Sequence, residues 1–357
     1  MIIIDWMEIM KEIGSTPITH PNAWRGKELN QTQEWVDYLS EDEINDLNSA
    51  LNTVTKKGLT WGNFGKEDFP LNVMKKRLAE LDTQLLNGRG FVLLRGLPIK
   101  QYTLNQIKVI YWGLSTYMGQ IMPQNVMGTK IEHIEDIKVA NLQDPNLRGY
   151  VTAKRLDAHS DNSDTVVLLC VDKAERGGMS SIVSTIAIYN KMLANRPDLL
   201  PSLFEGFRYD LRGEGPTGDL NETSEPVPVF SCHKGQIRSW FHRRLILGGA
   251  DKAGIQLSEI QKEALDYFVD AAHDPDLVLE HDLQPGDIQF LNNYVSVHFR
   301  THFEDGPNHK RLLLRLWYNR WERSQLDPTF EKSWIVAGYQ EREWAKTRVV
   351  TALGIRS

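Results

Sequence analysis

Three short motifs contain the residues of this sequence whose types and spacing could hold a metal ion. They are His133-Ile-Glu135, His159-Ser-Asp161 and His302-Phe-Glu304. On a β-strand, residues i and i+2 project from the same side, so the imidazole and the carboxylate of such a motif can reach one ion. A non-haem Fe(II) centre that activates oxygen needs two histidines and one carboxylate, and it leaves coordination positions open for substrates.

The surroundings of these motifs favour the one at His159. It directly precedes a run of branched apolar residues that predicts a strand. The His133 motif lies in a charged stretch typical of a solvated face, and the His302 motif runs into a loop. Another histidine, His298, lies far downstream on a second predicted strand. We therefore expect His159, Asp161 and His298 to converge in the folded chain.

Residues 311–319 alternate in a way that adds a second kind of chemistry. Arg311, Arg315 and Trp317 fall on one face of the predicted strand, and apolar side chains suited to a core fall on the other. A guanidinium in a concave site forms a fork for a carboxylate. The alternative is an edge strand with two solvated arginines, against which the apolar residues on the arginine face argue.

The elements that must position these residues are short strands and helices in mixed order. Apolar residues at helical spacing, several behind a capping residue, predict helices after Ser40, over 71–86, after Thr103, over 188–193 and after Ser258. Short apolar runs between turn residues predict strands over 91–94, 165–171, 181–185, 288–291, 294–301 and 311–319. This pattern predicts an α+β fold with a β-sandwich or barrel core covered by helices.

We expect one domain over 1–357, because no stretch has the composition of a linker. A helical N-terminal extension (1–88) is expected to pack on a core (89–322) with inserted helices, followed by a helical tail (323–357).

Composition excludes several classes of function. The formal net charge is -6, so the chain has no basic excess to attract a nucleic-acid backbone. A run of about 18 apolar residues, which a membrane-spanning helix needs, does not occur in the sequence. The two cysteines cannot build a disulfide framework, and the first ten residues lack the basic region of a signal peptide. These features lead us to expect a cytoplasmic protein, and a homo-oligomer is compatible with them.

In these motifs the sequence resembles the Fe(II)/2-oxoglutarate-dependent taurine dioxygenase-like (TauD/TfdA) family. The resemblance extends from about Asn22 to Trp317. It is carried by six blocks in order: Gly90-Phe-Val-Leu-Leu-Arg-Gly-Leu97, His159-Ser-Asp161, Gly177-Gly-Met-Ser-Ser-Ile-Val-Ser184, Pro285-Gly-Asp-Ile-Gln-Phe-Leu-Asn-Asn293, Val297-His-Phe-Arg-Thr301 and Arg311-Leu-Leu-Leu-Arg-Leu-Trp317. The family implies a clavaminate-synthase-like fold, a double-stranded β-helix or jelly-roll.

The resemblance also implies roles for individual positions. His159, Asp161 and His298 match the three iron ligands. Arg311 matches the arginine that pairs with the C5 carboxylate of 2-oxoglutarate. Arg315 matches a second arginine that meets the substrate or assists the co-substrate. Ser180 or Ser181 falls where the family places a hydroxyl near that carboxylate. The resemblance does not identify the residues that contact the primary substrate. The candidates for such contacts from the sequence are Asn125, Arg155, Trp240 and Arg243.

The implied function is oxidation of a small molecule, most simply hydroxylation of an unactivated C–H bond. Fe(II) would be the cofactor, with 2-oxoglutarate and O2 as co-substrates, and 2-oxoglutarate would be converted to succinate and CO2. The substrate is expected to be an amino acid or another small anion. Because Asp161 retains the carboxylate ligand, halogenation is disfavoured.

Three alternatives compete with hydroxylation. The same centre could perform desaturation, cyclisation or epoxidation, because substrate placement decides the outcome. The fold could instead serve a non-catalytic metal or carboxylate sensor. A zinc hydrolase is disfavoured because the sequence has no HExxH helix and no Gly-x-Ser-x-Gly elbow, and His242 and His273 are expected to be surface or packing residues.

Overall fold

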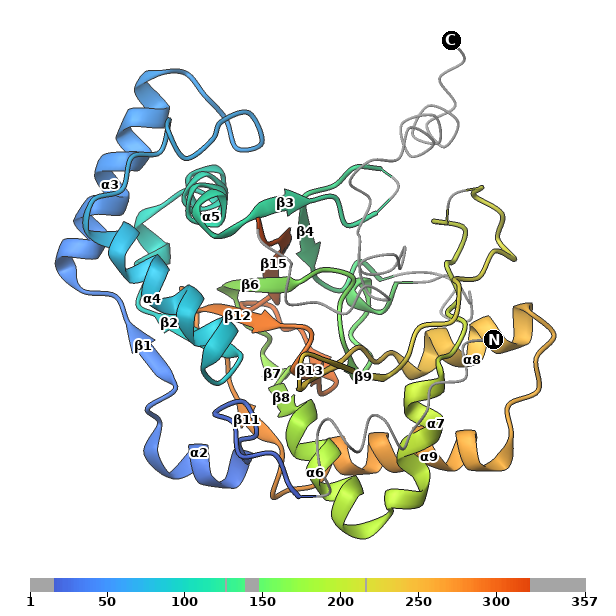
Figure 1. Cartoon of the computed structure of the whole chain (residues 1–357). Coiled ribbons are helices and arrows are strands. Elements are labelled where there is room, and N and C mark those ends of the chain that lie inside the picture. Colours follow the sequence, from blue (N-terminus) through green and yellow to red (C-terminus); the bar gives the residue numbers. More distant parts are fainter. Residues whose placement is uncertain (1–15, 126, 139–147, 216, 322–357) are drawn as a thin grey trace.

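Two β-sheets face one another across a shared apolar core in the computed structural model (Figure 1). The structure describes residues 16–125, 127–138, 148–215 and 217–321. The larger sheet has the strand order β1-β2-β12-β6-β15-β3, with β4 also paired to β15. The smaller sheet has the order β11-β8-β13-β5, and two short two-stranded sheets pair β9 with β10 and β7 with β14. The described part of the chain is thus a mixed fold of helices and strands.

The strands of the larger sheet are β1 (Val36–Tyr38), β2 (Phe91–Arg95), β3 (Gln120–Met122), β4 (Ile131–Ile134), β6 (Thr165–Asp172), β12 (Ile288–Asn292) and β15 (Leu312–Asn319). Those of the smaller sheet are β5 (Leu156–His159), β8 (Ser180–Ser184), β11 (Leu279–His281) and β13 (Ser296–Arg300). The remaining strands are β7 (Arg176–Gly177), β9 (Phe230–His233), β10 (Gln236–Ser239) and β14 (Phe303–Glu304).

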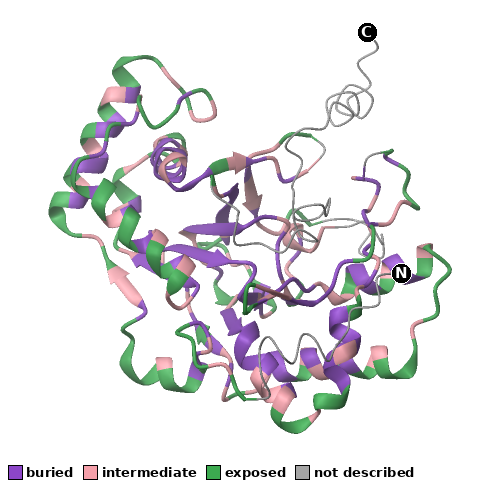
Figure 2. Ribbon diagram, viewed as in Figure 1, coloured by how far each residue is buried: buried purple, intermediate pink, exposed green. Residues whose placement is uncertain are grey.

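Helices cover the outer face of each sheet, as Figure 1 shows. The larger sheet packs against α3 (Glu41–Lys56), α4 (Val73–Asn87) and α5 (Leu104–Met118). The smaller sheet packs against α6 (Thr185–Asn195), α7 (Leu200–Glu205) and α9 (Glu259–Ala272). Two further α-helices are α2 (Gly26–Thr32) and α8 (Arg243–Lys252), and three short 3-10 turns are η1 (Ile99–Gln101), η2 (Gly149–Val151) and η3 (Pro197–Leu199). Buried residues therefore concentrate on the inward faces of the helices and in the strands (Figure 2).

Local signals in the sequence placed most of these elements correctly. Capping boxes begin α3 at Ser40, α5 at Thr103 and α9 at Ser258, as expected. The N-terminal residues, expected to be helical, also contribute the strand β1, which pairs in parallel with β2. The helix α8 and the β9–β10 hairpin were not predicted. The expected C-terminal helical tail lies outside the described residues, as do residues 1–15.

The strand β15 is interior, so the edge-strand alternative is wrong. It lies between β6 on one side and β3 and β4 on the other. Leu314 and Leu316 pack beneath the helices, whereas Leu313 and Trp317 lie in the core between the sheets. Both faces of the strand are therefore covered, and its two arginines are carried into the interior.

Two of the sequence blocks that carry the family resemblance meet at one end of the larger sheet. Arg95, at the end of β2, donates from Nε and Nη2 to the two carboxylate oxygens of Asp287, at 2.8 and 2.7 Å. Asp287 is fully buried, so this paired geometry compensates its lost hydration. Gly286 has a φ of 94°, and a Cβ there would lie 2.1 Å from the Leu97 carbonyl oxygen. The turn before β12 therefore requires glycine.

His281 on β11 should make folding stability sensitive to acid. Its Nε2 lies 2.6 Å from Gln289 Oε1, and burial lowers the pKa of the imidazole to about 4. The unfolded chain takes up this proton near pH 6.5 and the folded chain only near pH 4, so stability is lost as pH falls through that window. We expect the free energy of unfolding to drop by up to about 3 kcal/mol from this group.

Urea unfolding at pH 7 and at pH 4.5 measures this effect. His281→Gln keeps a hydrogen-bonding side chain but removes the titrating imidazole. Between the two pH values, its free energy of unfolding should therefore fall by about 2 kcal/mol less than that of the unmodified chain. An unchanged drop would show that other groups cause the acid sensitivity.

Candidate metal centre

Two neighbouring strands of the smaller sheet bring the distant histidines together. His159 ends β5 and lies opposite His298 on β13 in the antiparallel register. Their ring centroids are 4.5 Å apart, and Asp161 follows two residues beyond β5. Among the described residues, these three form a group whose possible ligand atoms all lie within 4.8 Å of one another.

Buried partners hold the loop that carries Asp161. Its backbone N–H donates to Asn293 Oδ1 at 3.0 Å, and its carbonyl accepts from Trp240 Nε1 at 3.1 Å. Arg315 Nη1 donates to Oδ1 of the carboxylate at 3.2 Å. The other oxygen, Oδ2, is buried without a hydrogen-bond partner among the described residues. One carboxylate oxygen is thus fixed, and the other is left to bind a cation.

The electrostatics of the group keep it in the protonation state that a metal needs. Burial opposes ionisation of Asp161, but the charge of Arg315 and the nearby imidazoles lower its pKa below the ordinary value. Burial, together with the proximity of His159, lowers the pKa of His298 to about 3. At neutral pH the group therefore offers an ionised carboxylate and a neutral His298.

The imidazole orientations leave one nitrogen of each histidine facing the group. His159 Nδ1 lies 2.7 Å from the Asp157 carbonyl oxygen, so this nitrogen donates and Nε2 remains for a ligand. His298 Nε2 lies 3.6 Å from Asp161 Oδ2. Two imidazole nitrogens and one carboxylate oxygen are the donor set of a non-haem ferrous site.

Trp240→Phe tests how much the hydrogen bond to the Asp161 carbonyl matters for metal binding. Partners that orient metal ligands typically contribute tenfold or more to metal affinity, so we expect a roughly tenfold weaker Fe(II) Kd. Trp112→Phe is the matched control, because its indole donates to the Phe64 carbonyl at 2.9 Å beneath the helices of the larger sheet. Equal effects of the two variants on Fe(II) affinity, measured by anaerobic titration, would contradict the positioning role.

Arg311 is a buried cation that lacks a full set of partners. Its side chain lies over the Phe303 ring at 5.1 Å, and only 4% of the residue is exposed. The Nη1 nitrogen is buried without a hydrogen-bond partner among the described residues. Burial lowers the pKa of the guanidinium to about 10, which still leaves it charged at neutral pH. Such a group fits a carboxylate that enters from solution.

Arg315 has a different environment, although it lies on the same strand face. Gln124 Oε1 accepts from its Nε at 2.7 Å, and Asp161 accepts from its Nη1. The guanidinium lies between the rings of Tyr150 and Trp317, at 4.7 and 4.8 Å. Arg315 therefore orients the Asp161 carboxylate and borders the cavity beside it.

The pairing register separates the two candidate serines. Ile182 lies opposite His298, and Ser180 lies opposite Arg300, so Ser180 projects from the face of the sheet that carries His298. Ser181 lies opposite Phe299, which packs in the core beneath the helices. Ser180 is thus the serine on the side of the metal group, and Ser181 faces away from it.

A cavity of about 160 Å³ opens beside the metal group. Arg155 and Arg243 line it, as do His159, Asp161 and Arg315. The volume corresponds to about five water molecules at ~30 Å³ each, so it suits a small ligand.

Two of the substrate candidates from the sequence are not among the residues that line this cavity. Trp240 is fully buried, and its indole N–H donates to the carbonyl oxygen of Asp161. Asn125 donates to the Glu132 side chain, whereas its neighbour Gln124 holds Arg315. Both side chains form contacts within the protein, and their role as substrate contacts stays a prediction.

His242, which the sequence predicts to be a surface or packing residue, lines the cavity. Its backbone bridges to that of His159, and their ring centroids are 5.2 Å apart. Sequence spacing gives no sign of this bridge, because the two residues lie 83 positions apart and outside a regular strand pair. The other two motifs stay separate: His133 lies 3.3 Å from Glu135 and His302 lies 3.9 Å from Glu304, at partly exposed positions.

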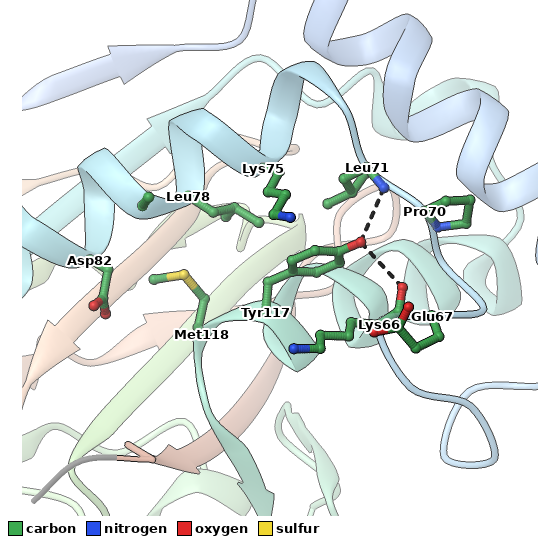
Figure 3. A pocket seen from close by; sticks show the side chains of 10 residues that line it. Lys66, Glu67, Pro70, Leu71, Lys75, Leu78, Asp82, Tyr117 and Met118 are labelled. Carbon is green, nitrogen blue, oxygen red and sulfur yellow. Dashed lines mark hydrogen bonds between the residues drawn. The ribbon is translucent and has the colours of Figure 1, made fainter.

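A second, larger cavity of about 500 Å³ lies on the helical side of the larger sheet (Figure 3). Residues of α4 and α5 and the loop before α4 line it, including Lys75, Tyr117 and Met118. Tyr117 Oη accepts from the Leu71 N–H at 3.1 Å and donates to the Phe69 carbonyl at 2.8 Å. None of the predicted site residues lines this cavity, which leaves the smaller one as the candidate reaction site.

The donor set and the buried arginine together define a class of protein, the non-haem iron oxygenases. The sequence matches the family described as "Taurine catabolism dioxygenase TauD, TfdA family" over residues 55–317, and the chain belongs to this family. The description of this family makes the chain an oxygenase.

Similar proteins agree with this assignment. The chain is 32% identical to FR-33289 synthase of Streptomyces rubellomurinus over 315 residues, which cover 87% of this chain and 92% of that one. An asparagine oxygenase, solved with Fe(II), 3-hydroxyasparagine and succinate, has a similar fold with a TM-score of 0.63 at 15% identity, over 80% of this chain and 94% of that one. The non-haem iron oxygenase OrfP, solved with Fe and alpha-ketoglutaric acid, gives a TM-score of 0.60 at 14% identity, over 79% and 93%.

In the part of the chain that the structure describes, no helix combines the length and the apolar character needed to cross a bilayer.

Proposed function

We propose that this oxygenase hydroxylates an unactivated C–H bond of a small molecule at a centre formed by His159, Asp161 and His298. When bound there, ferrous iron supplies with 2-oxoglutarate and O2 the oxidising chemistry that yields succinate and CO2. The 3-hydroxyasparagine and succinate in the asparagine oxygenase structure support this outcome.

Each protein group has a task in this proposal. His159 and His298 provide imidazole nitrogens, and Asp161 provides the carboxylate oxygen that Arg315 leaves free. Arg311 binds the distal carboxylate of 2-oxoglutarate, and Ser180, on the same side as His298, contributes a hydroxyl near it. The buried surroundings strengthen these charge-assisted contacts by excluding water.

The proposal rests on two buried charged side chains, each of which has an atom without a hydrogen-bond partner among the described residues. Asp161 Oδ2 accepts no hydrogen bond, and Arg311 Nη1 donates none, among the described residues. Leaving such groups unpaired costs about 1–3 kcal/mol each, and more when they are charged. A cation bound to Asp161 Oδ2 and a carboxylate bound to Arg311 Nη1 would remove both costs.

Succinate release tests the proposal directly. The purified chain, with Fe(II), ascorbate and 2-oxoglutarate under air, should release succinate slowly even without a primary substrate. A library of small acids and amino acids should contain compounds that accelerate the release. A product heavier by one oxygen atom indicates hydroxylation, whereas loss of two hydrogens indicates desaturation or cyclisation. Absence of Fe(II)-dependent succinate release would exclude the function.

We further propose that the two facing sheets form a double-stranded β-helix, or jelly-roll, within a single domain that includes the helices on both sides. The core between the sheets and the outer helical clusters support this description. Cys170 and Cys232 form no disulfide among the described residues, which favours a reducing compartment such as the cytoplasm.

A further inference from the structure

Two buried arginines lie against the ring of one phenylalanine, Phe303 on β14. The guanidinium carbon of Arg300 lies 4.6 Å from the ring centroid, and that of Arg311 lies 5.1 Å from it. All three residues are buried. A cation is attracted to the face of an aromatic ring, and this attraction is strongest where water is excluded. The ring of Phe303 is therefore an energetically favourable contact for both guanidiniums.

The guanidinium of Arg311 has little else to hold it. Its backbone N–H donates to Asp305 Oδ1 at 2.8 Å, but its side chain forms no hydrogen bond and no ion pair with another described residue. The guanidinium of Arg315, by contrast, is fixed by two hydrogen bonds. Contact with the Phe303 ring is therefore the interaction that orients the Arg311 side chain.

Gly178 allows the guanidinium and the ring to lie close together. Its φ is 75°, and a Cβ there would lie 3.2 Å from Arg311 Nε and 3.4 Å from Phe303 Cβ. The Gly178 N–H donates to the His302 carbonyl at 3.0 Å, which fixes the glycine beside β14. A larger residue at this position would press on both partners, so the backbone here accommodates the contact between Arg311 and Phe303.

Arg300 holds Phe303 in place. Among the described residues, its side chain donates to three carbonyl oxygens, those of Thr152, Ala153 and Thr301. The Ala153 carbonyl also accepts from the Phe303 N–H at 3.2 Å. One carbonyl oxygen thus binds both the Arg300 guanidinium and the Phe303 backbone, so the segment before β5 supports the two residues together.

The two guanidiniums differ in how their charge is compensated. Burial and the charge of Arg311 lower the pKa of Arg300 to about 9, and burial lowers the pKa of Arg311 to about 10, so both stay charged at neutral pH. The three carbonyl oxygens partly compensate the charge of Arg300. Arg311 has no such acceptors in the part of the chain that the structure describes. An anion that enters this interior is therefore attracted to Arg311 in particular.

We propose that Phe303 is a positioning residue for the co-substrate: its ring holds the Arg311 guanidinium ready for the distal carboxylate of 2-oxoglutarate, and Arg300 holds the ring. This inference rests on the proposed function, in which Arg311 binds that carboxylate. An arginine side chain has many rotamers, and a guanidinium that is already oriented loses less conformational entropy when the ligand binds. Phe303 thus acts through Arg311 rather than on the co-substrate itself.

Phe303→Leu tests this role, because leucine keeps an apolar side chain but removes the aromatic face. Anaerobic titrations of the complete chain with bound Fe(II) would compare 2-oxoglutarate with 2-oxopentanoate, which has a methyl group in place of the distal carboxylate. We expect the variant to bind 2-oxoglutarate about tenfold or more weakly, while the Kd of 2-oxopentanoate stays within about twofold. A merely structural role of the ring would not distinguish the two keto acids.

Three further variants complete the test. Phe290→Leu removes an equally buried ring on β12, which packs beneath the helices of the larger sheet, and it should leave both Kd values within about twofold. Phe303→Tyr keeps the ring and should bind 2-oxoglutarate within about threefold of the unmodified chain. Arg300→Lys keeps the charge but cannot donate to three carbonyls in the same geometry, so it should weaken 2-oxoglutarate alone by about three- to tenfold. Thermal unfolding confirms that each variant is folded, and Arg300→Lys provides the test if Phe303→Leu is not.

Initial rates of succinate release give a second readout. In Phe303→Leu the KM for 2-oxoglutarate should rise by about the same factor as the Kd, while kcat stays within about threefold. Equal weakening of the two keto acids, an unchanged Kd for 2-oxoglutarate, or the same loss in Phe290→Leu would each overturn the positioning role. The unmodified chain tests the proposed function separately. If it shows no preference for 2-oxoglutarate over 2-oxopentanoate, the role of Arg311 is wrong, whereas a preference that survives Phe303→Leu contradicts only the role of the ring.

Discussion

Replacing His159 with alanine is expected to reduce 2-oxoglutarate turnover at least a thousandfold, to the background of free iron. The variant loses one of the three ligand atoms that the structure places within 4.8 Å of one another. The remaining imidazole and carboxylate still reach an ion, but with weaker affinity and altered geometry. Succinate release and anaerobic Fe(II) titration measure the two effects separately.

His302→Ala is the control for this prediction. It removes the histidine of another His-x-acid motif, whose imidazole is 60% exposed and lies 3.9 Å from Glu304. Turnover and Fe(II) affinity should both stay within twofold of the unmodified chain. Substantial iron-dependent turnover in His159→Ala would remove this residue from the ligand set.

Arg311→Lys is expected to raise the KM for 2-oxoglutarate about 10- to 100-fold while Fe(II) affinity stays unchanged. Lysine keeps the positive charge but cannot reproduce the fork of a guanidinium. The loss corresponds to a charged hydrogen bond of about 1.5–3 kcal/mol, and about 1.4 kcal/mol equals one factor of ten. Initial rates of succinate formation at varied 2-oxoglutarate give the KM.

Arg25→Lys provides the matched substitution outside the site. Arg25 forms a largely exposed ion pair with Asp276 at 3.0 Å, so its conservative replacement should leave the KM unchanged. If Arg311→Lys also leaves the KM unchanged, another group holds the distal carboxylate. A parallel loss of Fe(II) affinity would instead indicate damage to the whole interior.

Local patterns in the sequence predicted much of the fold because they depend on neighbours within a few residues. The alternation over 311–319 assigned the two faces of β15, and the capping boxes located the starts of three helices. The same alternation indicated that Arg311 and Arg315 share a face. It could not show that the opposite sheet covers this face, because the strands of that sheet come from distant parts of the chain.

The contacts around the metal group were less predictable because they join residues far apart in sequence. Arg315 and Asp161 are separated by 154 positions, and Trp240 reaches the Asp161 carbonyl across 79. The choice between Ser180 and Ser181 depends on the strand register, since a slip of one residue reverses the faces. The role of Gln124, which holds Arg315, cannot be told from that of its neighbour Asn125 by sequence, because the segment before β4 has no periodicity that distinguishes them.

The position of β5 at the edge of the smaller sheet has a consequence for the chain without its ion. The described register joins β5 to β13 through only two residue pairs, and His159 contributes one of them. A cation shared by His159 and His298 would act as a cross-link between these strands, adding its binding energy to the few hydrogen bonds that hold the margin of the sheet. Loading with metal should therefore slow amide hydrogen exchange first along residues 156–161, before any effect reaches the interior of the larger sheet.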